Sequence, residues 1–82
     1  MNMQIVAKVT ISNSNFEDWS AFFDSYQEKR SEFVLNEVVE KINDNEARVS
    51  FEITDLEGLT RLSSSEEITS KEAELGVVTE IL

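Results

Sequence analysis

Two segments of the sequence alternate apolar and polar residues with a period of two, and this pattern limits what the chain can fold into. Residues 3–12 place every second side chain on one apolar face, formed by Met3, Ile5, Ala7, Val9 and Ile11. Residues 47–54 repeat the pattern with Ala47, Val49, Phe51 and Ile53. Because successive side chains of a strand point to opposite faces, both segments predict strands with one buried face.

A helical period follows the first of these strands. Ser14 and Glu17 have the spacing of a capping box, which predicts a helix that runs to about Arg30. At 100° per residue, six aromatic side chains fall within an arc of roughly 120°. They are Phe16, Trp19, Phe22, Phe23, Tyr26 and Phe33. This aromatic stripe is predicted to cover the apolar face of the sheet.

Residues 34–42 are rich in Val, Leu and Ile and predict another strand, with Val34, Val38 and Ile42 on one side. The polar residues 43–46 that follow are typical of a turn, since Asn and Asp tolerate left-handed backbone. We therefore expect a hairpin between this strand and the strand at residues 47–54.

Asp55 is predicted to cap a second helix, whose apolar stripe is Leu56, Leu59 and Leu62. The serines at residues 63–65 are predicted to interrupt this helix. Ser64 and Glu67 have the spacing of a second capping box, so a helix should restart there.

The restarted helix is predicted to run through Leu75 and to end at Gly76, before a short last strand at residues 77–82. The order is then βαββαβ, the ferredoxin-like pattern. Right-handed crossovers place both helices on one face of a four-stranded antiparallel sheet. We expect a single ferredoxin-like α+β domain over residues 1–82, with its second helix interrupted.

The composition excludes several classes of function. Acidic residues outnumber basic residues 17 to 7, which gives a net charge of −10. We therefore expect neither nucleic acid nor a membrane as a partner, because both need basic surface. The sequence has no histidine and no cysteine, which excludes a histidine base, a thiolate nucleophile, histidine-ligated zinc or haem, zinc fingers and iron–sulfur clusters. We expect no cofactor.

Length and patterning set two further expectations. The chain has 82 residues, and the core of so short a chain supplies only a few kcal/mol of net stability. With no disulfide available, oligomerisation is the remaining route to more stability, and a two-fold homodimer is its commonest form. No signal-peptide pattern and no apolar run of roughly 20 residues is present, so we expect a cytoplasmic protein.

With these elements in place, the sequence resembles the dimeric α/β-barrel superfamily, and in particular its small stand-alone members of unknown function, some of them from marine cyanobacteria. The resemblance covers most of the chain. It lies in Phe16-x-x-Trp19-x-x-x-Phe23-Asp24, in Ile53-Thr54-Asp55-Leu56, in Ser63-Ser64-Ser65-Glu66 and in Leu75-Gly76-Val77.

The resemblance implies ferredoxin-like protomers that press the open faces of their sheets together. Enzymes of the superfamily include cofactor-free oxygenases, haem proteins similar to chlorite dismutase and small isomerases. Several of these activities use a histidine, which this chain lacks. No catalytic residue is therefore carried over from them.

The outward face of the predicted sheet holds the most suggestive polar residues, Lys8, Arg48, Glu52 and Glu80. In a barrel dimer this face turns inward, where Lys8 and Arg48 would hold an anionic group of a small ligand. The other interpretation is that these charges pair across the strands and fill the barrel or face water. The sequence leaves both open.

Three other groups have a functional and a structural interpretation. Trp19 and Tyr26 would line a pocket between helix and sheet, although their place on the aromatic stripe also suits core packing. The acidic residues Glu66, Glu67, Glu72 and Glu74 would need to converge to bind a cation, and a helix surface explains them better. The serines 63–65 lack a histidine base and are better explained as helix caps.

Two classes of function fit this chain. The first is a non-catalytic homodimeric module that binds a small molecule or a partner protein. The second is a cofactor-free enzyme of the oxygenase or isomerase kind, with its reaction in a cavity of each protomer. We expect the first, because the usual catalytic residue types are missing and function must be argued from a site. A closed barrel filled with charges would favour the first, and an open pocket with a lone Lys8, Arg48 or Glu52 would favour the second.

Overall fold

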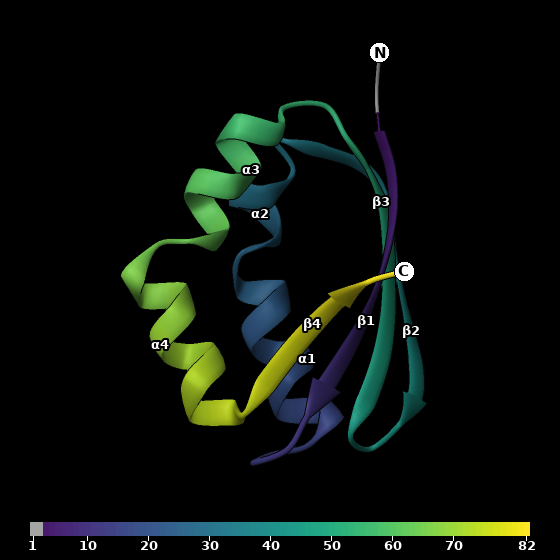
Figure 1. The fold of residues 1–82 in the computed structure, drawn as a ribbon, viewed down its shortest axis with the longest axis vertical. Coiled ribbons are helices and arrows are strands. Elements are labelled where there is room, and N and C mark those ends of the chain that lie inside the picture. The colour runs from purple at the N-terminus through teal and green to yellow at the C-terminus, as the bar shows by residue number, and fades with distance from the viewer. Residues whose placement is uncertain (1–2) are drawn as a thin grey trace.

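The computed structural model describes residues 3–82 as a four-stranded antiparallel sheet with helices packed against it (Figure 1). The elements are β1 Met3–Ile11, α1 Phe16–Ser25, α2 Gln27–Arg30, β2 Val34–Asn43, β3 Glu46–Ile53, α3 Leu56–Ser63, α4 Glu66–Leu75 and β4 Val77–Ile81. The strand order is β2-β3-β1-β4, and every neighbouring pair is antiparallel. The predicted α+β class with a four-stranded antiparallel sheet is confirmed.

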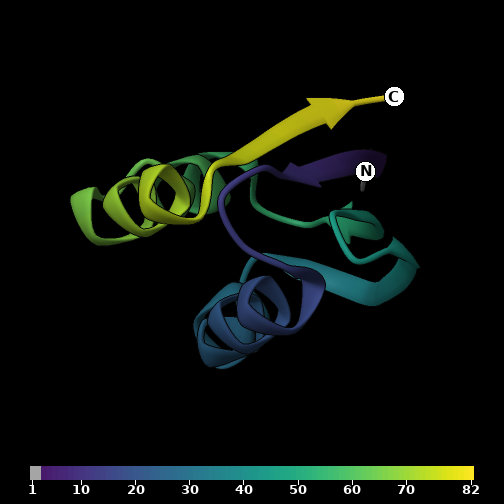
Figure 2. The same cartoon turned by 90° about the horizontal axis from the view of Figure 1, so that it is seen from below.

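The helices lie on one side of the sheet and leave its other side open, as Figures 1 and 2 show. This arrangement follows from the alternation in β1 and β3. Ala7, Val9 and Ile11 are buried on the helix-facing side, whereas Thr10 between them is exposed. The predicted apolar face of these two strands is therefore the face that the helices cover.

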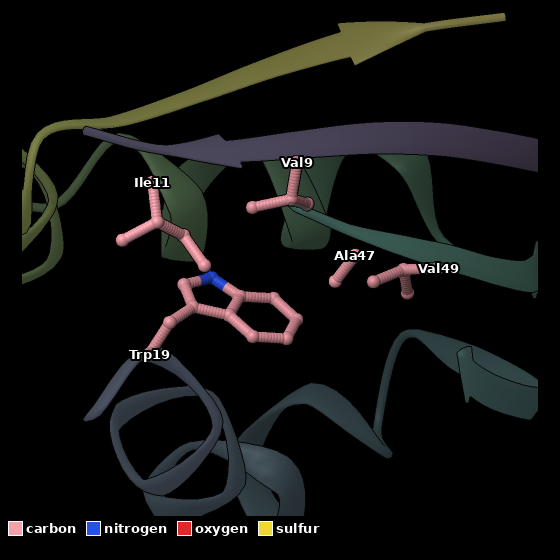
Figure 3. Packing of buried hydrophobic residues seen from close by; sticks show 5 residues of the cluster. All are labelled: Val9, Ile11, Trp19, Ala47 and Val49. Atoms are coloured by element: carbon pink, nitrogen blue, oxygen red, sulfur yellow. The ribbon is translucent and has the colours of Figure 1, made fainter. Parts of the chain in front are cut away.

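Trp19 forms the centre of the core. Its side chain is 2% exposed and packs with Val9, Ile11, Ala47 and Val49. In Figure 3 the indole ring projects from α1 toward these four side chains. Trp19 also stacks on Phe23, with ring centroids 4.8 Å apart. Phe16 and Phe22 also pack against this core, so the part of the aromatic stripe that lies on α1 covers the sheet as predicted, whereas Phe33 lies beyond the end of α2. Burying one such ring stabilises the fold by about 1.5–3 kcal/mol.

The start of α1 differs from its prediction by one residue. Asn15 is the N-cap, and its Oδ1 accepts a hydrogen bond of 2.9 Å from the backbone N–H of Asp18. Ser14, which was predicted to cap, donates instead to the Asp18 carboxylate over 2.6 Å. Asn and Ser are about equally good caps, so the capping-box spacing of Ser14 and Glu17 did not show which of the two neighbouring residues caps the helix.

The first helix also ends earlier than predicted. α1 stops at Ser25, and a separate turn, α2, covers residues 27–30. Ser25 Oγ donates to the carbonyl oxygen of Phe22, and the backbone N–H of Tyr26 bonds to Phe23, three residues back. Such local bonds compete with the helical ladder and break it at Tyr26.

The prediction that Val34, Val38 and Ile42 share one side of β2 is wrong. The pairing of β2 with β3 shifts register between Leu35 and Val38, and Asn36 adopts a left-handed φ of 55°. The alternation is therefore reversed beyond the bulge. Val34 faces the helices and is 4% exposed, whereas Val38 pairs with Ser50 on the open face and is 59% exposed.

The turn between β2 and β3 is shorter than the predicted four-residue loop and consists of Asp44 and Asn45. The Asn45 side-chain amide donates to the carbonyl oxygens of Ile11 and Ser14 over 2.9 and 3.0 Å. The hairpin is therefore tied to the connection between β1 and α1.

The second pair of helices begins and ends largely as predicted. Asp55 caps α3 by accepting a 3.0 Å bond from the N–H of Gly58, and Gly76 ends α4 at a φ of 69°. The break between α3 and α4 also lies at the predicted serines. The cap does not, because Ser65 is the N-cap of α4, and Ser64 Oγ donates to Thr60 at the end of α3.

The two candidate caps of α1 give a direct test of the local structure. We expect Asn15→Ala to lower the free energy of unfolding by about 1 kcal/mol, because it removes the acceptor for the Asp18 N–H. Ser14→Ala should lower it by less, because it removes only an exposed side-chain bond. Urea unfolding followed by Trp19 fluorescence measures both, and a larger effect at Ser14 would contradict this assignment of the cap.

Candidate functional site

Three of the four residues predicted on the outward sheet face lie in one row. The register places Glu80, Lys8, Arg48 and Glu40 side by side across all four strands. The signs of charge along this row are negative, positive, positive and negative. Glu52 lies farther along β3, opposite Gln4, and accepts a hydrogen bond from Asn36. Among residues 3–82, the salt bridges of the structure involve neither Lys8 nor Arg48.

Apolar side chains surround this charged row, and the sequence did not predict them there. On β2, Leu35, Val38 and Ile42 are 50%, 59% and 40% exposed. At the opposite edge, Val78 and Leu82 are 65% and 63% exposed, and Leu82 is held beside Val6 by a backbone hydrogen bond. These exposed apolar side chains thus lie along the two edge strands, on either side of the charged row. We call these five residues the open-face patch.

The other side of the sheet holds a cavity. Its volume is about 230 Å³, and it lies between the helix-facing side chains of β1, β3 and β4 and the four helices. Most of its lining is apolar, and the aromatic members are Trp19, Phe22, Phe23, Tyr26 and Phe51. Ile81, which also lines it, is 62% exposed, so the cavity opens to solvent beside β4.

The structure thus brings Trp19 and Tyr26 together at one cavity. Trp19 belongs to the core as well, because it packs in the buried cluster with Val9 and Val49, which line the same cavity. The charged residues predicted on the open face lie on the opposite side of the sheet from this cavity. The two groups of predicted site residues therefore belong to two separate surfaces.

Arg30 contributes a buried charge to the cavity wall that sequence reasoning missed. Its side chain forms a two-pronged ion pair with Glu37, with N–O distances of 2.5 and 2.9 Å. A third bond of 3.0 Å goes to the carbonyl oxygen of Phe23, and the guanidinium lies 3.6 Å from the centre of the Phe23 ring. No sequence signal links Arg30 to Glu37, because the bulge at Asn36 brings Glu37 to this face.

Glu72 adds an acidic side chain to the cavity wall. It lies on α4, is half-buried and makes no salt bridge or side-chain hydrogen bond among the residues that the structure describes. Burial raises the pKa of its carboxyl group above the ordinary value. A carboxylate in such a setting attracts cations and hydrogen-bond donors.

Tyr26 has a different environment at the edge of the same cavity. Hydrogen bonding to Glu67 raises the pKa of its hydroxyl group, and desolvation and the charge of Glu67 act in the same direction. A phenol with a raised pKa is a weaker acid at neutral pH. Tyr26 is therefore better suited to donate a hydrogen bond than to transfer a proton.

The acidic residues of α4 do not form a cation site. Within residues 3–82, no group of three or more acidic side chains converges in a way that would hold a metal ion. Ser63 and Ser64 both donate their hydroxyls to the carbonyl oxygen of Thr60, as is usual at the end of a helix.

Among residues 3–82, no helix is long and apolar enough to cross a membrane.

No family model matches the chain, and none of the curated proteins or solved structures compared with it gives a significant match.

The environment of Glu72 predicts a specific dependence of stability on pH. Because its pKa is raised above 4.5 by burial, the folded chain holds this proton more tightly than the unfolded chain does. The ionised form therefore destabilises the fold above the raised pKa, and this effect vanishes below the unfolded value. We expect Glu72→Gln to increase the free energy of unfolding at neutral pH, with the gain disappearing as the solution is acidified.

Urea unfolding at several pH values measures this gain. Glu66→Gln is the matched control, because it removes the same charge from an exposed position on the same helix. A gain at Glu72 that stayed constant down to low pH would contradict the assigned cause.

Proposed function

We propose that this chain is a non-catalytic homodimeric module that binds a small molecule in the cavity between its helices and its sheet. The observation that carries the proposal is the cavity itself. It has a mostly apolar wall that includes aromatic rings, a few polar groups and one open side, which are the usual properties of a small-molecule site. Its volume of about 230 Å³ lies slightly below the range for drug-sized ligands.

The proposed fold is ferredoxin-like, as the resemblance to the dimeric α/β-barrel superfamily implies. Two features support it. If α1 with α2 and α3 with α4 are each counted as one interrupted helix, the order is βαββαβ. In addition, each central strand is followed by a helical connection to an edge strand. β1 leads through α1 and α2 to β2, and β3 leads through α3 and α4 to β4.

The open face of the sheet is the proposed dimer interface. The open-face patch supplies the apolar area that a sheet-to-sheet contact needs, and it lies along both edges of the sheet. The charged row between these edges contains two acidic and two basic residues, so its net charge is zero. Two copies can therefore approach through this row despite the overall charge of −10.

The alternative is a cofactor-free enzyme, and Glu72 is the observation in its favour. A cavity carboxyl group with a raised pKa is a common setting for a catalytic acid or base. The other titratable groups of the cavity wall do not complete such a site. Arg30 is engaged by Glu37, and Tyr26 is made less acidic by Glu67. Binding therefore accounts for the cavity better than catalysis does.

The dimer is tested by placing a charge in the open-face patch. We expect Val38→Glu to shift the protein from dimer to monomer, because it would bury an unpaired charge between the sheets. Arg48→Glu should weaken the dimer as well, because it leaves three acidic residues in the charged row. Native mass spectrometry and light scattering measure the oligomeric state.

Leu56→Glu is the control for these variants. Leu56 is 53% exposed on α3, outside the sheet. A wild-type protein that is monomeric at all concentrations, or variants that stay dimeric, would contradict the proposed interface.

Ligand binding is tested through Trp19, the single tryptophan of the chain, which lines the cavity. We expect 2-phenylethanol, a small neutral aromatic probe, to change Trp19 emission in a saturable way. Ser63 lines the cavity from an exposed position, so Ser63→Phe should fill part of the space and weaken binding at least about tenfold.

Ser64→Phe is the matched control, since Ser64 is the next residue and does not line the cavity. Equal binding by both variants would place the probe elsewhere. Native mass spectrometry of freshly purified protein, with the denatured mass alongside, shows whether a ligand is retained from the cell.

A further inference from the structure

The charged groups of the cavity wall favour one class of ligand. This inference rests on the proposed function and specifies it. Arg30 is the basic group of the wall, and its donors are directed to Glu37 and to the carbonyl oxygen of Phe23. The pair with Glu37 has no net charge and presents little attraction to an anion. Glu72 therefore determines the sign of the charge that a ligand meets there.

Glu72 is also free to bind. Among residues 3–82, its carboxylate is in none of the salt bridges or side-chain hydrogen bonds, although it is half-buried in the wall. A partly desolvated carboxylate without a partner is stabilised by any donor that reaches it, and a cationic donor stabilises it most.

The aromatic rings of the wall also favour a cationic ligand. The face of an aromatic ring attracts a cation, and the wall contains Trp19, Phe22 and Phe51 besides two rings that already lie near cations of the chain. The structure already shows this attraction within the chain, where the Arg30 guanidinium lies over Phe23 and the Lys29 ammonium lies 5.6 Å from the centre of the Tyr26 ring. The net charge of −10 further raises the local concentration of cations around the molecule.

The volume favours a small ligand. A space of about 230 Å³ lies below the usual range for drug-sized ligands. A compact molecule with one flat apolar ring therefore suits the aromatic wall.

We propose that the cavity binds a small primary amine with an aromatic or compact aliphatic body, whose ammonium group donates hydrogen bonds to Glu72. The apolar body lies against Trp19 and Phe51, and the ammonium group lies toward α4. Neutral molecules of the same shape bind less tightly, and carboxylates bind least.

Three probes of one shape test this preference. They are 2-phenylethylamine, 2-phenylethanol and phenylacetate, which share the ring and differ in the charge of the polar end. Trp19 emission reports the binding of each. We expect the amine to bind at least about tenfold more tightly than phenylacetate, since each 1.4 kcal/mol of preference is a factor of ten.

Substitution of Glu72 locates the source of the preference. Glu72→Gln should weaken binding of the amine by about tenfold and change binding of the alcohol by less than about twofold. Glu72→Asp keeps the charge and should retain part of the preference, which separates loss of charge from loss of folding. Glu66→Gln, which removes a charge outside the cavity, should leave all three affinities unchanged.

The outcomes distinguish this inference from the proposed function. If none of the three probes changes Trp19 emission, and Ser63→Phe has no effect, the proposed binding function itself fails. If the alcohol binds but the amine has no advantage, or if phenylacetate binds most tightly, the amine preference is overturned and the cavity remains a binding site. An amine preference that persists in Glu72→Gln would also overturn it, because nonspecific attraction to the acidic surface would then be the cause.

Discussion

The bulge at Asn36 determines what both faces of the sheet present. Before it, Val34 faces the helices, and after it the alternation is reversed, so that Glu37 lies toward the helices and Val38 toward the open face. One residue with left-handed backbone therefore has two consequences. It supplies the carboxylate that neutralises Arg30 in the cavity wall, and it places Val38 on the surface where a second copy is proposed to bind.

The polarity of the cavity follows from this pairing. A buried guanidinium without a partner would attract anions strongly, and leaving it unpaired would be costly to the fold. Because Glu37 and the Phe23 carbonyl oxygen satisfy Arg30, the remaining charge in the wall is that of Glu72. The ligand preference proposed for the cavity thus depends on a residue of β2 that lies on the far side of Arg30 and does not line the cavity.

The sequence predicted those features whose cause is local. Alternation placed β1 and β3 correctly, the aromatic period placed Trp19 against the sheet, and Asp55 and Gly76 marked helix ends through their own backbone preferences. The features that it missed depend on contacts between residues distant in the sequence, or on two neighbouring residues that are equally suited to one structural role. The bulge in β2 is set by pairing with β3, and Asn15 and Ser14 compete for one cap. The pairing of Arg30 with Glu37 could not be predicted, because it exists only once the bulge is in place.

The two proposed binding surfaces meet at β4. Within the sheet of residues 3–82, this edge strand has five residues and pairs with β1 alone. Its side chains alternate between the surfaces: Ile81 forms the open rim of the cavity, while Val78 and Leu82 belong to the open-face patch. A cavity of about 230 Å³ lowers the packing energy available to an 82-residue chain, and a ligand that binds only the folded state restores stability. In the proposed dimer, a second copy that covers Val78 and Leu82 holds the same strand in place. Dimerisation and ligand binding should therefore support each other through β4, because each stabilises the conformation of the strand that the other requires.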